Sequence, residues 1–425
     1  MRLYSTKHEA AEVSFKEAVF KGLPEDNGLY LPINIPRLPD VFYDSLHALH
    51  FSEIAYEVAS ALIGDEIKPE ALKLITDDAF DFPVPLKRID DNTHILELFH
   101  GPTLAFKDFG ARFMSRIMKY FLASEDKEIT ILVATSGDTG GAVGSGFLGL
   151  EGVKVVILYP GGKISELQER QLTTLGQNVS ALKVEGTFDD CQALVKKAFL
   201  DDNLNNQLRL SSANSINISR MIPQSFYYFY AVGQANIPEI VFSVPSGNLG
   251  NLSGGLLAQK MGLPVRHFIA ASNANATFPD YLHTGIYQPR ASIETISNAM
   301  DVGAPSNFAR INDWYPNEIT NNISGYSFND EQTKAAILEM HENEDYILCP
   351  HTAVGYLGLK KYQEDHNIPG IILSTAHPAK FQDSLEEILN KPIKIPDALS
   401  SLLNKDKNFT AIKNSYKELT EFLLE

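Results

Sequence analysis

The sequence predicts an α/β protein in which helices cover parallel sheets, and three observations support this fold class. Six short runs read as strands, and most are almost continuously apolar, as is typical of strands buried on both faces. Helical patterns lie between these runs, and this alternation indicates parallel sheets with right-handed crossovers. The length of 425 residues, 44% of them hydrophobic, suggests two or three domains. The predicted strands cover residues 129–135, 153–160, 179–186, 239–247, 265–272 and 370–376.

Three helices in the middle of the chain have recognisable starts. The first follows Lys107, because an apolar residue recurs there every four positions, at Phe109, Phe113, Ile117 and Phe121. Ser165 and Gln168 form a capping-box pattern that starts a second helix, and Gly176 is a suitable stop for it. Thr187 is the predicted cap of a third helix over residues 188–199.

We divide the chain into three regions. Residues 1–95 are predicted to be helical and irregular, and residues 96–220 to form a smaller αβ domain that carries Lys107. Residues 221–425 are predicted to form a larger αβ domain. Within it, residues 275–330 lack clear periodicity, which fits either a long functional excursion or simple loops.

The composition narrows the function classes. A net charge of -17 disfavours nucleic acid or an anionic membrane as a partner, although one locally positive pocket is enough for an anionic small molecule. We expect no signal peptide and no membrane span, because no apolar run is long enough. Two cysteines, Cys191 and Cys349, are few for a chain of this length and indicate a reducing compartment, so a cytoplasmic location is predicted. Cys349 and His351 are too isolated to predict a metal site.

Lys107 is the first candidate for chemistry. It lies in HGPTLAFKDFG (100–110), between Phe106 and Asp108 at a predicted helix start. An apolar setting lowers the pKa of a lysine and favours the neutral, nucleophilic amine. The alternative is a first-turn lysine whose stem runs along the edge of a core.

A glycine-rich turn after a strand is the second candidate. In VFSVPSGNLGNLSGGLL (241–257), a buried strand runs into a turn and then a helix. Gly247 and Gly250 leave backbone amides free, Asn248 and Asn251 add side-chain donors, and the helix N-terminus attracts a phosphate. The alternative is an ordinary strand-to-helix turn.

Two further strand ends carry small polar residues. ILVATSGDTGGAV (131–143) presents hydroxyls and amides suited to a carboxylate, and its candidates are Thr135, Ser136, Gly137, Asp138, Thr139 and Gly140. GIILSTAHPAKF (370–381) ends its strand in Ser374 and Thr375, and a hydroxyl at this edge suits a ring nitrogen. Simple caps are the alternative in both places.

A lysine, a phosphate turn, a carboxylate loop and a neutral hydroxyl together indicate an enzyme that uses pyridoxal phosphate, with the lysine as the Schiff-base residue. The rival is a nicotinamide dehydrogenase that uses GSGFLG (144–149). This rival is weaker, because the glycines begin nine residues beyond the strand, whereas a dinucleotide turn begins at once. Close packing of a helix explains these glycines better.

At this point the sequence resembles the threonine synthase family, in its shorter microbial form, over nearly the whole chain. The motifs that carry the resemblance occur in family order: KGLPEDNGLYLP (21–32), HGPTLAFKDFG, TSGDTGGA, NSINISR (214–220), SGNLGN, DVGAPSNFARI (301–311) and STAHPAKF. The resemblance implies a fold-type-II enzyme with two αβ domains, the cofactor between them, and an N-terminal extension.

The resemblance also implies roles for particular residues. Lys107 would be the catalytic and cofactor-binding lysine, and Thr375 would face the pyridine nitrogen. The cofactor phosphate would bind at Gly247, Asn248, Leu249, Gly250 and Asn251. The substrate-carboxylate loop usually carries Asn in related enzymes but has Asp138 here, which leaves its contacts and charge open.

The implied reaction converts O-phosphohomoserine and water to threonine and phosphate, in a monomer or small homo-oligomer. The expected substrate-binding residues are Thr103, Thr135, Ser136, Gly137, Asp138, Thr139, Asn214, Ser215, Asn217 and Arg220. Arg220 is the first choice for the substrate phosphate; Lys163, Arg310, Arg112, Ser306 and Asn307 are weaker choices. A serine/threonine dehydratase and a non-catalytic relative that binds phosphorylated ligands remain the alternatives.

Overall fold

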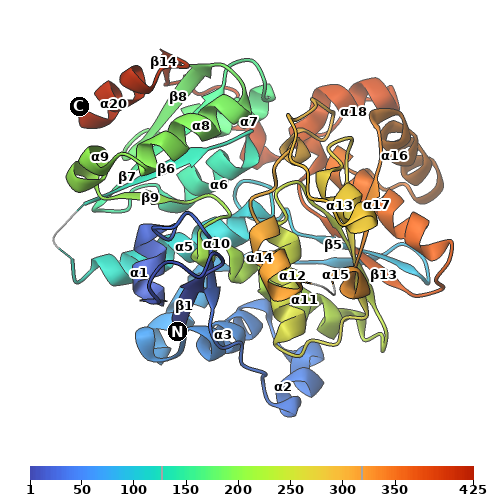
Figure 1. Ribbon diagram of the computed structural model, residues 1–425. Coiled ribbons are helices and arrows are strands. Elements are labelled where there is room, and N and C mark those ends of the chain that lie inside the picture. Colours follow the sequence, from blue (N-terminus) through green and yellow to red (C-terminus); the bar gives the residue numbers. More distant parts are fainter. Residues whose placement is uncertain (126–127, 317–318) are drawn as a thin grey trace.

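The protein is described by a computed structural model that covers residues 1–125, 128–316 and 319–425 (Figure 1). The larger of its two parallel sheets has six strands in the order β12-β11-β10-β13-β5-β4, all parallel except the edge strand β4. Its strands are β4 (Leu86–Arg88), β5 (Thr93–Glu97), β10 (Val241–Pro245), β11 (His267–Ser272), β12 (Ile323–Ser327) and β13 (Gly370–Ser374).

The second sheet has five strands, all parallel, in the order β14-β8-β7-β6-β9. Its strands are β6 (Ile129–Ala134), β7 (Val153–Pro160), β8 (Val179–Glu185), β9 (Leu210–Ser212) and β14 (Thr410–Lys413). A small antiparallel sheet is formed near the N-terminus by β1 (Arg2–Ser5), β2 (Val13–Ser14) and β3 (Tyr30–Pro32). The predicted α/β class with two open parallel sheets is confirmed, and each of the six predicted strands overlaps an observed one.

Sheet membership does not follow the three sequence regions. Strand β4 precedes residue 96 and β5 spans it, and both pair within the larger sheet. Strand β14, near the C-terminus, pairs with β8 of the smaller one. The N-terminal region also contains a sheet, so its description as helical and irregular is incomplete. Figure 1 shows the C-terminal helix α20 (Tyr416–Leu424) beside the smaller sheet. The sheets differ from the predicted regions because strands pair with segments that are distant in the sequence. A local sequence pattern does not reveal such pairing.

Helices cover both faces of each parallel sheet. In β6, Ile131 and Val133 face the core shared with α5 (Lys107–Leu122) and α6 (Asp138–Phe147). Leu132 and Ala134 face the opposite core with α8 (Phe188–Phe199) and α20. The larger sheet lies between α17 (Pro350–Gln363) on one face and α11 (Pro223–Ala235) with α12 (Gly250–Lys260) on the other. Strands buried on both faces explain the nearly continuous apolar runs.

The predicted helix starts are confirmed. α5 begins at Lys107, and its apolar stripe is buried. Both the Ser165 capping box of α7 (Glu166–Thr173) and the Thr187 capping box of α8 are formed. α7 ends at Thr173, before Gly176, because the amide of Thr174 already closes the last turn on Arg170.

The other elements connect and cover these layers. The weakly periodic residues 275–330 contain α13 (Thr277–Thr284), η3 (Asn298–Met300), α14 (Phe308–Trp314), α15 (Ile319–Asn322) and β12. None of the helices in the described part of the chain is both long and apolar enough to cross a membrane. The remaining helices are α1 (Phe15–Lys21), α2 (Asp40–Ser45), η1 (Leu46–Ala48), α3 (Phe51–Ile63), η2 (Gly64–Glu66), α4 (Pro69–Ala79), α9 (Asp202–Leu208), α10 (Ile218–Met221), α16 (Asp330–Glu344), η4 (Pro378–Phe381), α18 (Gln382–Leu389) and α19 (Asp397–Ser400).

Candidate active site

The loop before α5 is fastened to the end of β13. The amide of Phe106 donates to the carbonyl of Thr375 over 2.8 Å, and the amide of His377 donates to the carbonyl of Leu104 over 3.0 Å. Leu104 adopts a left-handed backbone, φ +56°, to make this approach. Lys107, at the first turn of α5, is therefore held close to the segment of Thr375.

The amine of Lys107 is set up to be neutral. The side chain is mostly buried, and its Nζ lies 4.4 Å from the centre of the Phe106 ring. Among the described residues it has no hydrogen-bond partner. Burial, followed by the nearby positive charge of Arg220, lowers the pKa of Lys107 to about 8, although Asp138 acts in the opposite direction. An amine with this pKa is partly neutral at physiological pH, as nucleophilic and proton-transfer chemistry requires.

We therefore expect Lys107 to react with acetic anhydride at lower pH than an ordinary lysine does. With its pKa lowered from 10.5 to about 8, about half of the amine is neutral at pH 8 and about one tenth at pH 7. Competitive labelling of cofactor-free protein, followed by mass spectrometry of the Lys107 peptide, measures this midpoint. The same peptide labelled after unfolding is the control and should titrate about two and a half pH units higher. Coincident folded and unfolded midpoints would contradict the assignment.

The turn after β10 presents a cluster of unpaired backbone amides. Within the described residues, the amides of Gly247, Asn248, Leu249 and Gly250 donate to no protein acceptor. Leu249 has φ +59°, a left-handed conformation that directs the turn into α12. Successive free amides at the start of an eleven-residue helix favour an anion.

The two asparagine side chains in this turn have other partners. Asn251 donates to the carbonyl of Pro245 over 2.9 Å and accepts from the hydroxyl of Ser246 over 2.5 Å. Asn248 donates to the hydroxyl oxygen of Ser215 over 2.9 Å. These side-chain amides hold the shape of the turn. The predicted anion donors that remain available here are the backbone amides.

Ser215 links three segments that are far apart in the sequence. Its hydroxyl also accepts from Asn307 over 3.1 Å, and Asn248 accepts from the amide of Ser306 over 2.5 Å. Asn214 donates to the carbonyl of Ala134 over 2.9 Å, at the end of β6. The segments around Asn214, Asn248 and Ser306 therefore meet near the end of β6.

Arg220 is a buried cation with unused donor capacity. Only 2% of it is exposed, one Nη donates to the carbonyl of Ala213, and its buried Nε has no partner within the described residues. Burial lowers the pKa of this guanidinium to about 10, partly offset by Asp108. The guanidinium lies against α5, because a Cβ built on Gly110 would come within 2.7 Å of its Nε.

The weaker cation candidates are committed elsewhere. Arg310 is fully buried and donates to the carbonyls of Ser215, Ile216 and Tyr30 and to Asn307. Arg112 pairs with Asp81 at 2.7 Å, and Lys163 forms an exposed pair with Glu294 at 3.0 Å. Of these four predicted cations, Arg220 alone retains an unpartnered buried donor in the described structure.

The loop after β6 contains an ionised carboxylate that is already paired. Asp138 lies 2.7 Å from Nζ of Lys380 and accepts from the amide of Gln168 over 3.0 Å. Burial alone would raise the pKa of Asp138, but Lys380 and Gln168 outweigh it and hold the pKa below its ordinary value. Asp138 therefore contacts a lysine and is charged.

The other loop residues divide into two groups. Thr135 accepts through its hydroxyl from the amides of Gly137 and Gly140, at 2.9 and 2.8 Å, and so shapes the loop. Gly137 has φ +128°, a conformation that favours glycine. Ser136 lines a pocket of about 380 Å³ and, like Thr139, is partly exposed.

Two predicted substrate-binding side chains stabilise the fold instead. The hydroxyl of Thr103 donates to Asp108 over 2.7 Å, and the amide of Asn217 donates to the carbonyls of Val19 and Ser212. Both side chains are buried and hydrogen-bonded within the protein. Their predicted direct contact with substrate is not favoured by this geometry.

Sequence reasoning missed Lys380 and His351. Lys380, the lysine of the STAHPAKF motif, is fully buried beside Asp138. His351 accepts at Nε2 from the amide of Ala299 over 3.1 Å, and its buried Nδ1 has no partner in the described chain. Burial lowers the pKa of His351 to about 4, so the ring is neutral. An apolar strand followed shortly by a lysine is a signal that could have found Lys380.

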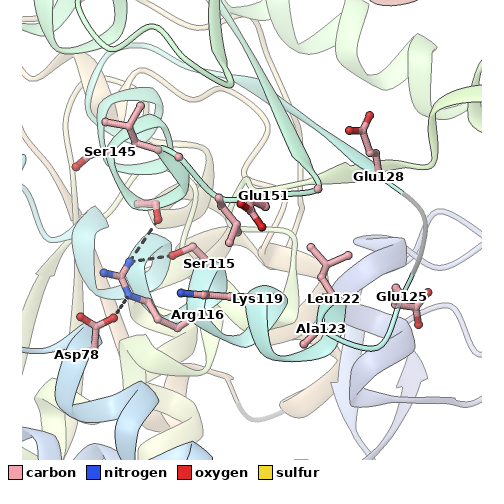
Figure 2. A pocket seen from close by; sticks show the side chains of 15 residues that line it. Asp78, Ser115, Arg116, Lys119, Leu122, Ala123, Glu125, Glu128, Ser145 and Glu151 are labelled. Carbon is pink, nitrogen blue, oxygen red and sulfur yellow. Dashed lines mark hydrogen bonds and ion pairs between the residues drawn. The ribbon is translucent and has the colours of Figure 1, made fainter.

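A pocket of about 750 Å³ lies elsewhere in the described structure (Figure 2). Its lining includes Ser115, Arg116 and Lys119 of α5 and the C-terminal end of α6 with the residues after it, whereas Lys107 and Asp138 begin those helices. Twelve residues of α-helix separate Lys107 from Lys119, a distance of about 18 Å. Figure 2 shows Arg116 bonded to Asp78 and Ser115.

Three family models match the chain. Residues 84–374 match "Pyridoxal-phosphate dependent enzyme", residues 2–80 match "Threonine synthase N terminus", and residues 352–423 match "Threonine synthase, C-terminal". The first match spans more than half of the chain. By fold and site, the chain is therefore a member of the pyridoxal-phosphate-dependent enzymes.

The relatives narrow this class. Threonine synthase from Serratia marcescens is 44% identical over 100% of this chain and 99% of its own, and that from Escherichia coli is 46% identical over 94% of both. The crystal structure of the Escherichia coli enzyme superposes with a TM-score of 0.94, at 44% identity over 100% of this chain and 99% of that chain. A PLP-bound threonine synthase from Brucella melitensis superposes with a TM-score of 0.93, at 34% identity over 100% of this chain and 98% of that chain. The chain belongs to the threonine synthase family.

Proposed function

We propose that the protein converts O-phosphohomoserine and water to L-threonine and phosphate, using pyridoxal phosphate. One observation carries the proposal. The unpartnered amine of Lys107 lies near the buried guanidinium of Arg220, whose Nε also has no partner among the described residues. An enzyme that removes a phosphate group from an amino acid needs a neutral amine and a separate cation for the leaving group. The names of the full-length relatives support the same activity.

The residues present fit the cofactor. The free amides at residues 247–250 suit its phosphate, and Lys107 suits its aldehyde. Thr375 is buried at the end of β13, and its hydroxyl has no partner among the described residues, which suits a pyridine nitrogen that needs an uncharged neighbour. When bound, pyridoxal phosphate supplies a ring that accepts the negative charge left by a departing substrate proton.

The chain's own residues would handle the protons and the leaving group. Lys107, as a neutral amine, removes the proton from Cα of the substrate and, once charged, returns a proton at Cγ. Arg220 binds the departing phosphate, because an unpaired buried guanidinium gains most from an anion. The loop at Ser136 and Thr139 holds the substrate carboxylate through backbone amides.

The turn amides give a prediction about cofactor affinity. A Cβ on Gly247 would lie 2.7 Å from Cα of Met300, so Gly247→Ala must displace one of two backbones. We expect about 1–3 kcal/mol of strain and at least about tenfold weaker binding of pyridoxal phosphate, measured by absorbance titration. Gly250→Ala is the comparator: its Cβ would lie 3.1 Å from Cβ of Ser215, a milder contact that should weaken binding less. Equal affinity in wild type and Gly247→Ala would contradict the placement of the phosphate.

The activity is tested directly with purified protein. Addition of O-phosphohomoserine should change the visible absorption spectrum and release phosphate and threonine in equal amounts. Formation of a ketoacid from threonine would instead indicate the dehydratase, which the close relatives do not support; a fungal L-serine ammonia-lyase, 14% identical with a TM-score of 0.54, shares the fold alone. A protein that binds phosphorylated ligands without turnover would be the non-catalytic alternative.

The nicotinamide alternative conflicts with the structure. Gly144 and Gly146 lie inside α6 and not in a turn after a strand. A Cβ on Gly146 would lie 3.2 Å from the backbone of Ala111, so the glycines permit close packing of α6 on α5, as the sequence indicated.

We also propose a cytoplasmic location and a monomer or small homo-oligomer that binds neither nucleic acid nor membrane. Two buried free cysteines, Cys191 and Cys349, and a net charge of -17 support this setting. Light scattering measures the oligomeric state, and cell fractionation measures the location.

A further inference from the structure

We propose that Lys380 determines the specificity for the substrate's carboxylate, because it cancels the charge of Asp138 in the loop that receives that carboxylate. The inference rests on the proposed function and adds a positioning residue to it. Without Lys380, Asp138 would be an unpaired buried carboxylate, which repels an anionic substrate at any pH that keeps it ionised.

Lys380 is committed to this loop. It is fully buried in η4, after β13, and its Nζ lies 2.7 Å from Asp138 and 2.9 Å from the carbonyl of Thr103. Asp138 begins α6 of the smaller sheet, so the pair also crosses between the two sheets. A lysine buried this completely requires a charged or polar partner, and Asp138 provides one.

The loop around Asp138 is otherwise suited to an anion. In the described part of the chain, the amides of Ser136, Asp138 and Thr139 donate to no protein acceptor, while those of Gly137 and Gly140 are used by Thr135. These three amides stand at the start of the ten-residue helix α6, where the helix dipole favours negative charge. His351, whose buried Nδ1 is unpartnered, lies close enough to Asp138 for that carboxylate to influence its pKa.

The charges in this loop indicate the role of Lys380. The amides attract a carboxylate, and the Asp138 anion repels it. The Lys380 cation restores a neutral side-chain pair at 2.7 Å. A ligand with the same amine and phosphate but without the carboxylate should be insensitive to this balance. Loss of Lys380 is therefore expected to weaken binding of the ligand's carboxylate and of no other group of the ligand.

The experiment compares two ligands on holoenzyme of wild type and Lys380→Met. O-phosphohomoserine carries the carboxylate, and 3-aminopropyl phosphate is the same molecule without it. By steady-state kinetics, the substitution should raise the KM for O-phosphohomoserine, used here as its apparent affinity, at least about tenfold. It should change the inhibition constant of 3-aminopropyl phosphate by no more than about twofold. Equal weakening of both ligands, or of neither, would overturn the proposal.

Two further variants separate charge from general damage. Lys380→Met combined with Asp138→Asn removes both charges, and affinity for O-phosphohomoserine should return to within about threefold of wild type. Asp138→Asn alone leaves the cation unopposed, so the preference for the carboxylate-bearing ligand should increase; a decrease would overturn the proposal even if Lys380→Met does not fold. Lys407→Met is the matched control, since Lys407 pairs with Glu166 and Glu169 at 2.6 Å on α7, and both affinities should stay unchanged. Failure of the proposed function is distinguishable, because wild type would then release no phosphate.

Discussion

Replacing Lys107 with alanine should reduce threonine formation by more than about a thousandfold and remove the protein's covalent hold on the cofactor. Both effects have one cause: among the residues described, Lys107 is the lysine that follows the Phe106–Thr375 hydrogen bond and has a pKa lowered to about 8. The measurement is phosphate release together with borohydride reduction, which should label Lys107 in wild type and nothing in the variant.

Lys107→Arg separates the charge of this side chain from its chemistry. Arginine keeps a cation at the start of α5 but is never neutral at working pH, so it should be as inactive as alanine. Thermal unfolding of both variants checks that the fold survives. Activity of either variant within tenfold of wild type would contradict the assignment of Lys107 as the catalytic lysine.

Replacing Arg220 with alanine should lower kcat/KM for O-phosphohomoserine by about 100- to 1,000-fold while the visible colour of the cofactor remains. The guanidinium is 2% exposed, its Nε has no partner among the described residues, and it forms no ion pair there. An anion could therefore bind this guanidinium without breaking an ion pair. Steady-state kinetics and the absorption spectrum measure the two outcomes.

Arg116→Ala is the matched control for Arg220→Ala. Arg116 also lies at α5 but pairs with Asp78 at 2.8 Å at the far pocket of Figure 2, and its loss should leave kcat/KM unchanged. Loss of colour in Arg220→Ala would show that the arginine supports the fold or the cofactor. Unchanged kinetics would remove it from the substrate site.

Local patterns were sufficient for much of the site. The strand-turn-helix patterns at residues 131–143 and 241–257, and the lysine at the start of an apolar helix, depend on neighbours within a few residues. The glycine-rich turn has its free amides, α5 begins at Lys107, and α6 begins at Asp138. The roles of these residues stay predictions that the variants above test.

The sequence by itself determined the α/β class and the order of the main strands and helices, because both follow from short-range periodicity and capping. Tertiary structure alone decided which polar groups remain free. Asn251, Thr103 and Asn217 have the right chemistry for ligands but are bonded within the fold, whereas Arg220 keeps an unused donor. It also decided that Asp138 meets Lys380, 242 residues further along the chain, at 2.7 Å. Long-range pairing sets these partners, and a linear pattern contains no information about which buried group will find which neighbour.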